Sequence, residues 1–231
     1  MQTGLIQVYT GNGKGKTTAA LGLALRARAV GKRVAIVFFD KGGEHYSERA
    51  LLGSIGVDWF GYGLDRIDPT TNRFRFGVIA EDISQAEQGI AKALELFSFR
   101  HPERSEAKSR DLVQQVEISP LRSRTHSGRN DAGGYDLLIL DEINTTVALG
   151  MLPESAVEHL LDAKPSTTEI LLTGRTEVSK AATNPPGQPW PNGPEQQRWL
   201  SYFNRADLLT EMHLHKHYFY QGTPAREGID Y

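Results

Sequence analysis

Short apolar runs alternate with longer amphipathic stretches along much of the chain. Residues 34–39 and 137–140 are apolar throughout, a pattern typical of strands buried on both faces of a parallel sheet. Residues 78–97 carry apolar side chains at helical spacing. Over the whole chain the pattern predicts strands at 4–10, 34–39, 57–60, 137–140 and 169–172, helices at 16–30, 44–52, 78–97 and 153–163, and one or two extended segments within 206–220.

Repeated strand–helix units of this kind predict an α/β fold. The sheet is expected to be mostly parallel, with right-handed crossovers and helices on both faces. Ligands bind at the carboxyl ends of the strands in such sheets. We therefore expect the loops at 10–17, 40–44, 141–144 and 173–176 to surround one site.

The first of these loops has the composition of a phosphate-binding loop. Residues 10–18 read Thr-Gly-Asn-Gly-Lys-Gly-Lys-Thr-Thr, between the first predicted strand and helix. Its glycines let backbone N–H groups converge on an anion, and the helix start adds partial positive charge. The loop is one residue shorter than the usual motif, and a chance glycine-rich turn is the alternative. The predicted phosphate-binding residues are Gly11, Asn12, Gly13, Lys14, Gly15, Lys16, Thr17 and Thr18.

Composition narrows the class of protein. The chain has 231 residues, a formal net charge of −2 and no cysteine. The charge gives no reason to expect nucleic acid or a membrane surface as a partner, and the lack of cysteine excludes disulfides and cysteine-held metals. No secretory signal is evident, and no apolar run approaches the about 20 residues of a membrane helix. We expect a cytoplasmic protein.

Two stretches interrupt the single domain predicted over residues 1–231. Residues 99–134 are rich in Arg, Ser, Glu, Lys and His and are predicted to be a disordered or loosely helical surface insertion. Nucleic-acid contact through its arginines is the alternative, opposed by the interleaved acidic residues. Residues 183–199 are rich in Pro, Gly and Asn and are predicted to be an irregular loop, where Trp190 and Trp199 indicate a lid or docking flap.

Several segments together resemble one known family. These are the shortened loop and its helix at 11–27, the strand ends at 37–42, 138–143 and 171–175, and the C-terminal segments 206–212 and 216–231. They are similar to the P-loop class of ATP:corrinoid adenosyltransferases, the cob(I)alamin adenosyltransferases of vitamin B12 assembly and salvage. Residues 61–66 depart from the Gly-Phe-Thr-Trp-like motif that the family places near its corrinoid pocket.

The resemblance implies a P-loop NTPase (RecA-like) fold and a specific reaction. Cobalt(I) of a reduced corrinoid would attack the 5′ carbon of ATP and release triphosphate, in adenosylcobalamin biosynthesis or salvage. Lys16, Thr17 and Glu142 would be the catalytic residues. The implied ligands are ATP, Mg²⁺ and the corrinoid, and the implied partner is an electron-donating reductase. A homodimer is expected only because it is the commonest oligomeric state.

Charged residues at three other strand ends complete the predicted site. Asp141 and Glu142 are expected to hold magnesium together with Thr17, the alternative being an acidic helix N-cap. Lys41 is expected to line the ATP or corrinoid side. Arg175 is expected to contact phosphate or ribose, or else to form a surface ion pair.

Two C-terminal patterns allow alternatives. His213, His215 and His217 alternate and would share one face of a strand, so that a metal site is conceivable there, although no carboxylate or cysteine motif accompanies them. The cluster of Tyr218 and its two aromatic neighbours is expected in the core or at a dimer contact, rather than as a platform for the corrin.

Two other functions are compatible with the sequence. One is a P-loop phosphotransferase or ATPase that makes ADP, and the other is a regulator that binds ATP, with or without a corrinoid, and does not turn it over. The phosphate product separates these from an adenosyltransferase, because only adenosyl transfer releases triphosphate.

Overall fold

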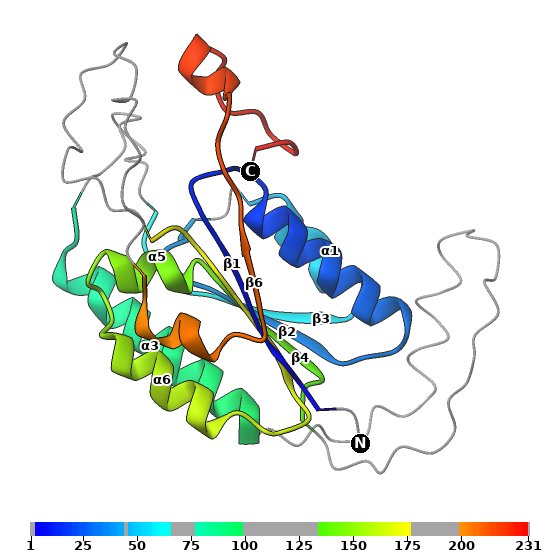
Figure 1. Ribbon diagram of the computed structural model, residues 1–231. Helices are drawn as coiled ribbons and strands as arrows, with labels where there is room; N and C mark the ends of the chain where they lie inside the picture. Colours follow the sequence, from blue (N-terminus) through cyan, green and yellow to red (C-terminus); the bar gives the residue numbers. More distant parts are fainter. Residues whose placement is uncertain (1–2, 44–45, 66–76, 99–133, 177–198, 231) are drawn as a thin grey trace, which may run out of the picture.

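The computed structural model describes residues 3–43, 46–65, 77–98, 134–176 and 199–230, which form one parallel sheet covered by helices (Figure 1). The strands in the described part of the chain are β1 (Ile6–Thr10), β2 (Val34–Phe38), β3 (Val57–Gly61), β4 (Leu137–Asp141), β5 (Glu169–Thr173) and β6 (Leu208–Glu211). Their order in the sheet is β3-β2-β4-β5-β1-β6, and every pairing is parallel. This confirms the predicted α/β class.

Helices cover both faces of the sheet (Figure 1). On one face lie α1 (Lys16–Ala29) and α2 (Glu48–Leu52), and on the other lie α3 (Ala80–Ser98), α5 (Ile143–Ala148), α6 (Glu154–Ala163) and the 3₁₀ helix η1 (Ser201–Arg205). A second 3₁₀ turn, η2 (Tyr218–Gln221), follows β6. No helix of the described residues is long and apolar enough to span a membrane.

Small side chains let α1 approach the sheet closely. Ala20, Ala24 and Ala27, one or two turns apart, are buried against the apolar side chains of β2 and β4. Both of these strands are buried along their whole length, as the continuous apolar runs predict. The layer of alanines therefore fixes the position of the helix that begins at the phosphate-binding loop.

The strand order positions the loops for a common site. β5 lies between β1 and β4, and β2 adjoins β4 on its other side. Because all the strands are parallel, the loops after β1, β2, β4 and β5 emerge at the same edge of the sheet. This confirms that the predicted strand-end loops gather there.

Some elements differ from the sequence prediction. The helix expected at 44–52 begins only at Glu48, residues 44–45 lying outside the described part. Neither α5 nor η1 was predicted, because each is too short to show a helical period. Residues 218–221 form a 3₁₀ turn instead of an extended segment. The stretches 99–134 and 183–199 lie outside the described residues except for their last members, so the predictions made for them stay predictions.

Exchanging the small residue at the centre of the α1 contact tests this packing. Ala24 is 0 % exposed, so Ala24→Leu should lower the free energy of unfolding by about 1–3 kcal/mol through overpacking. Its neighbour Leu25 is 57 % exposed, and Leu25→Ala should change the same quantity by about 0.5 kcal/mol or less. Chemical denaturation measures both, and equal losses would contradict the orientation of α1.

Candidate active site

The phosphate-binding loop curls around the side chain of Lys16. The Lys16 ammonium donates to the carbonyl oxygens of Gly11, at 2.6 Å, and Gly13, at 2.8 Å, and the residue is only 5 % exposed. Gly15, with a φ of 115°, turns the chain into α1, where no side chain caps the first turn. Backbone N–H groups at the start of a helix without a cap are available to an anion.

The chain that leaves β6 packs directly on this loop. The Gly13 N–H donates to the Met212 carbonyl at 2.6 Å, and Asn12 Oδ1 accepts from the Leu214 N–H at 2.8 Å. A Cβ atom on Gly13 would lie 2.7 Å from the Met212 carbonyl oxygen, and one on Gly11 would lie 2.4 Å from it. The glycines are therefore required by close backbone contact, in addition to any contact with phosphate.

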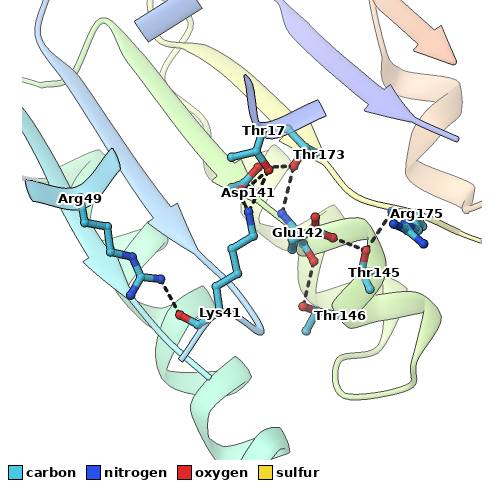
Figure 2. Close-up of polar contacts among 9 residues, drawn as sticks. All are labelled: Thr17, Lys41, Arg49, Asp141, Glu142, Thr145, Thr146, Thr173 and Arg175. Carbon is cyan, nitrogen blue, oxygen red and sulfur yellow. Dashed lines mark hydrogen bonds and ion pairs between the residues drawn. The ribbon is translucent and has the colours of Figure 1, made fainter. Parts of the chain in front are cut away.

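Asp141 lies at the centre of the polar contacts (Figure 2). Its carboxylate accepts hydrogen bonds from the hydroxyls of Thr173, at 2.6 Å, and Thr17, at 3.1 Å. The ammonium of Lys41 lies 2.5 Å from the same oxygen that Thr17 contacts, and 2.8 Å from the Thr17 hydroxyl. Asp141 is 1 % exposed, so this carboxylate is held by three side chains from three different segments.

The charge of Lys41 is stabilised by its acidic neighbours. Burial on its own would lower the pKa of Lys41, but the carboxylates of Asp141 and Glu142 and the hydrogen bond to Asp141 outweigh it, so the pKa lies above its usual value. Lys41 is therefore a permanent cation at physiological pH, in contact with the carboxylate predicted to hold metal.

Glu142 adopts a backbone conformation that is uncommon outside glycine. Its φ is 65°, and its N–H donates to the Thr173 hydroxyl at 3.0 Å. Its carboxylate accepts from the Thr145 hydroxyl at 2.5 Å, and the Thr145 hydroxyl in turn accepts from the Arg175 N–H at 2.8 Å (Figure 2). Glu142 occupies the N-cap position of α5 without making a side-chain capping bond. Such strain, held by specific contacts, is typical of functional sites.

A cavity of about 790 Å³ opens above these residues. This volume lies within the range common for ligand sites. Gly11 and Asp141 are buried beneath it and are not among the lining residues. The predicted residues that line it are Asn12, Gly13, Lys14, Gly15, Lys16, Thr17, Thr18, Lys41, Glu142 and Arg175. The structure thus brings the predicted set together, while the role of each residue stays a prediction.

Comparison with known proteins identifies the family. The model of the family described as ATP:corrinoid adenosyltransferase BtuR/CobO/CobP matches residues 2–183 and 196–231. The chain belongs to this family. The resemblance stated from the sequence is therefore confirmed, as is the P-loop type of α/β fold that it implied.

Individual relatives agree with this assignment. The corrinoid adenosyltransferase CobA of Salmonella typhimurium and the corrinoid adenosyltransferase of Escherichia coli K12 are each 30 % identical over 230 residues, covering 100 % of this chain and 87 % of theirs. An uncharacterized protein of Nostoc sp. is 30 % identical over 238 residues, and the chain spans about half (48 %) of its length.

In this member of the adenosyltransferase family, sequence reasoning missed one wall of the cavity. Lys14 donates to the Tyr218 hydroxyl at 2.8 Å and the Ile229 carbonyl at 3.1 Å, and it pairs with the Asp230 carboxylate. Tyr218 thus lies beside the phosphate-binding loop and not in the core, which was one of the two positions expected for it; the other, a dimer contact, stays a prediction. The C-terminal segment 216–231 carried part of the family resemblance, but it contains no motif that indicates a position near bound phosphate.

The histidine alternative fails on geometry. β6 ends at Glu211, so His213, His215 and His217 do not lie on a strand and do not share a strand face. Within the described residues, no group of three or more His, Cys, Asp or Glu side chains could hold a metal ion. His217 instead lines the cavity.

Adding one methyl group to the phosphate-binding loop tests its contact with the segment that follows β6. Gly13→Ala would bring the new methyl against the Met212 backbone, and we expect the affinity for ATP to fall by about tenfold or more because the loop must shift. Gly22→Ala is the matched control, since a methyl there meets no atom within 4 Å, and alanine within α1 should raise stability by up to about 1 kcal/mol. Titration with a fluorescent ATP analogue measures the difference, and unchanged affinity in Gly13→Ala would contradict the packing.

Proposed function

We propose that the chain transfers the 5′-deoxyadenosyl group of ATP to the cobalt(I) of a reduced corrinoid, in adenosylcobalamin biosynthesis or salvage. The family assignment over nearly the whole chain is the observation that carries this proposal. The cavity supports it, because the phosphate-binding loop forms one side of a space large enough for a nucleotide.

The proposed chemistry is an in-line displacement at the 5′ carbon. Cobalt(I) supplies the electron pair of the new cobalt–carbon bond, the carbon–oxygen bond breaks, and triphosphate leaves with the bonding electrons. Since cobalt(I) is already a strong nucleophile, no side-chain base is needed. The protein must align the two reactants and stabilise the charge on the leaving group. We assign the second task to the loop N–H groups, Lys14 and Lys16, with Arg175 contacting phosphate or ribose.

The oxygen ligands at the strand ends suit a magnesium ion. Thr17, Asp141 and Glu142 offer a hydroxyl and two carboxylates, which are the hard donors that Mg²⁺ prefers, and it normally adds substrate phosphates to one or two carboxylates. When bound, the ion would neutralise part of the triphosphate charge. The contact between the Thr17 hydroxyl and Asp141 supports assigning these two residues to one ion.

Further parts of the proposal follow from the reaction class. Cobalt(I) must be generated by an electron-donating reductase, and ATP as co-substrate favours the cytoplasm as the location. We also propose that residues 1–231 act as one domain and that two copies associate as a homodimer, the commonest oligomer. None of these steps requires nucleic acid or a membrane.

Product analysis tests the proposed reaction. Incubation with ATP, Mg²⁺ and chemically reduced cobalamin should give the visible spectrum of the adenosylated corrinoid together with one triphosphate per adenosyl group. Diphosphate and phosphate in place of triphosphate would indicate an ATPase. ATP binding without any product, where the Salmonella enzyme turns over, would indicate a regulator.

Removal of the loop lysine tests the assignment of the triphosphate. Lys16→Ala should lower the rate of adenosyl transfer by about a hundredfold or more, because it deletes a buried cation from the leaving-group site. Lys92→Ala is the control, since Lys92 forms an exposed ion pair with Glu95 on α3 and should leave the rate unchanged. Equal rates in Lys16→Ala and the parent protein would refute the assignment.

A further inference from the structure

Lys41 contacts the same oxygen atoms that a magnesium ion would use. Its ammonium lies 2.8 Å from Thr17 Oγ1 and 2.5 Å from Asp141 Oδ2, and these two oxygens are 3.1 Å apart. Neighbouring ligands of an octahedral Mg²⁺ at 2.0–2.1 Å are about 2.9 Å apart. The distance between these two oxygens is thus close to the distance between neighbouring ligands of Mg²⁺, and the Lys41 ammonium contacts both oxygens.

Lys41 both contacts Asp141 and lines the cavity, as Thr17 also does. Asp141 is 1 % exposed and does not line the cavity, whereas Lys41 does, and its side chain is 13 % exposed. The other Asp141 oxygen already accepts from the Thr173 hydroxyl. An ion that binds Thr17 Oγ1 and Asp141 Oδ2 from the cavity therefore competes with the ammonium, which already contacts both oxygens.

Only the side chain of Lys41 has to move for this exchange. The backbone N–H of Lys41 donates to the Tyr62 carbonyl at 3.2 Å, and the backbone carbonyl of Lys41 accepts from the Arg49 guanidinium at 2.5 Å (Figure 2). The backbone is thus held from two sides. A lysine has four methylene groups, which let the ammonium swing while the main chain stays in place.

We propose that Lys41 is a placeholder for magnesium, so that Mg²⁺ binds between Thr17 and Asp141 only together with ATP. The inference rests on the proposed function, which assigns these residues to Mg²⁺. Without nucleotide, the ammonium already balances the Asp141 charge, and its displacement by an ion requires another anion for it to contact. The phosphates of ATP provide that anion inside the cavity that Lys41 lines. ATP and Mg²⁺ therefore strengthen each other's binding, by the same factor in both directions.

Removing the lysine charge should uncouple metal from nucleotide. In Lys41→Met, the Asp141 carboxylate loses its counter-ion, and Mn²⁺ alone should bind about tenfold or more tightly than to the parent protein. Electron paramagnetic resonance of Mn²⁺ in the absence of nucleotide measures this directly. Lys41→Gln, which retains a hydrogen-bond donor for Asp141 but no charge, should show the same gain. Parent-level Mn²⁺ affinity in both variants would overturn the proposal.

Thermal unfolding gives a second readout, because Mg²⁺ would not reverse the loss of a lysine whose role is purely structural. Mg²⁺ alone should raise the melting temperature of Lys41→Met but not that of the parent protein, because the ion replaces the missing cation. Lys164→Met is the matched control. Lys164 is a partly buried lysine whose ammonium donates to the backbone carbonyls of Gly4 and Thr168 and not to a carboxylate, so Mg²⁺ should not restore the stability of Lys164→Met. A Lys41→Met protein that stays unfolded at high Mg²⁺ also counts against the proposal.

One further measurement separates this inference from the proposed metal site. The parent protein with ATP should bind Mn²⁺. If it does and the Lys41 variants gain no affinity without nucleotide, only the placeholder role is wrong. If the parent protein binds no Mn²⁺ with ATP, the assignment of metal to Thr17, Asp141 and Glu142 is wrong as well.

Discussion

One buried carboxylate, that of Asp141, holds together the ends of four strands. It belongs to β4, accepts from Thr173 of β5 and from Thr17 in the helix after β1, and pairs with Lys41 in the loop after β2. Asp141 is 1 % exposed, and Lys41 supplies the opposite charge beside it. Removing one partner of such a buried pair typically costs about 3–5 kcal/mol. The geometry of the phosphate-binding loop relative to the acidic strand therefore depends on this pair.

The sheet was predictable because its signal is local. The continuous apolar runs of β2 and β4 are buried throughout, and α1 begins at Lys16 as predicted. What the sequence did not predict depends on tertiary contacts. α5 begins after Glu142, which has a positive φ and whose N–H donates to the Thr173 hydroxyl at the end of β5. The turn at 218–221 packs where Tyr218 contacts Lys14, a pairing across more than two hundred positions.

The sequence predicted those residues of the candidate site that follow the carboxyl ends of strands, where ligands bind in a parallel sheet. Residues 12–18 of the phosphate-binding loop, Lys41, Glu142 and Arg175 all line one cavity, as their positions after buried strands indicate. The contributions of Thr173 and Asp230 were not predictable. A threonine that orients a carboxylate and an aspartate that contacts Lys14 have no motif of their own, and they become recognisable only when distant segments are seen in contact.

The position of β1 has a consequence for how the chain reaches this structure during synthesis. β1 is made first, yet both of its neighbours come from the second half of the chain, with Ile6 opposite Ile170 and Gln7 opposite Leu208. Pairings this distant form slowly, and a strand that lacks neighbours invites association with other chains. A ribosome that stalls before residue 208 therefore leaves a nascent polypeptide with an open edge on its first strand. The phosphate-binding loop, although encoded near the start, can make its contacts with Met212 and Leu214 only after those residues have been synthesised.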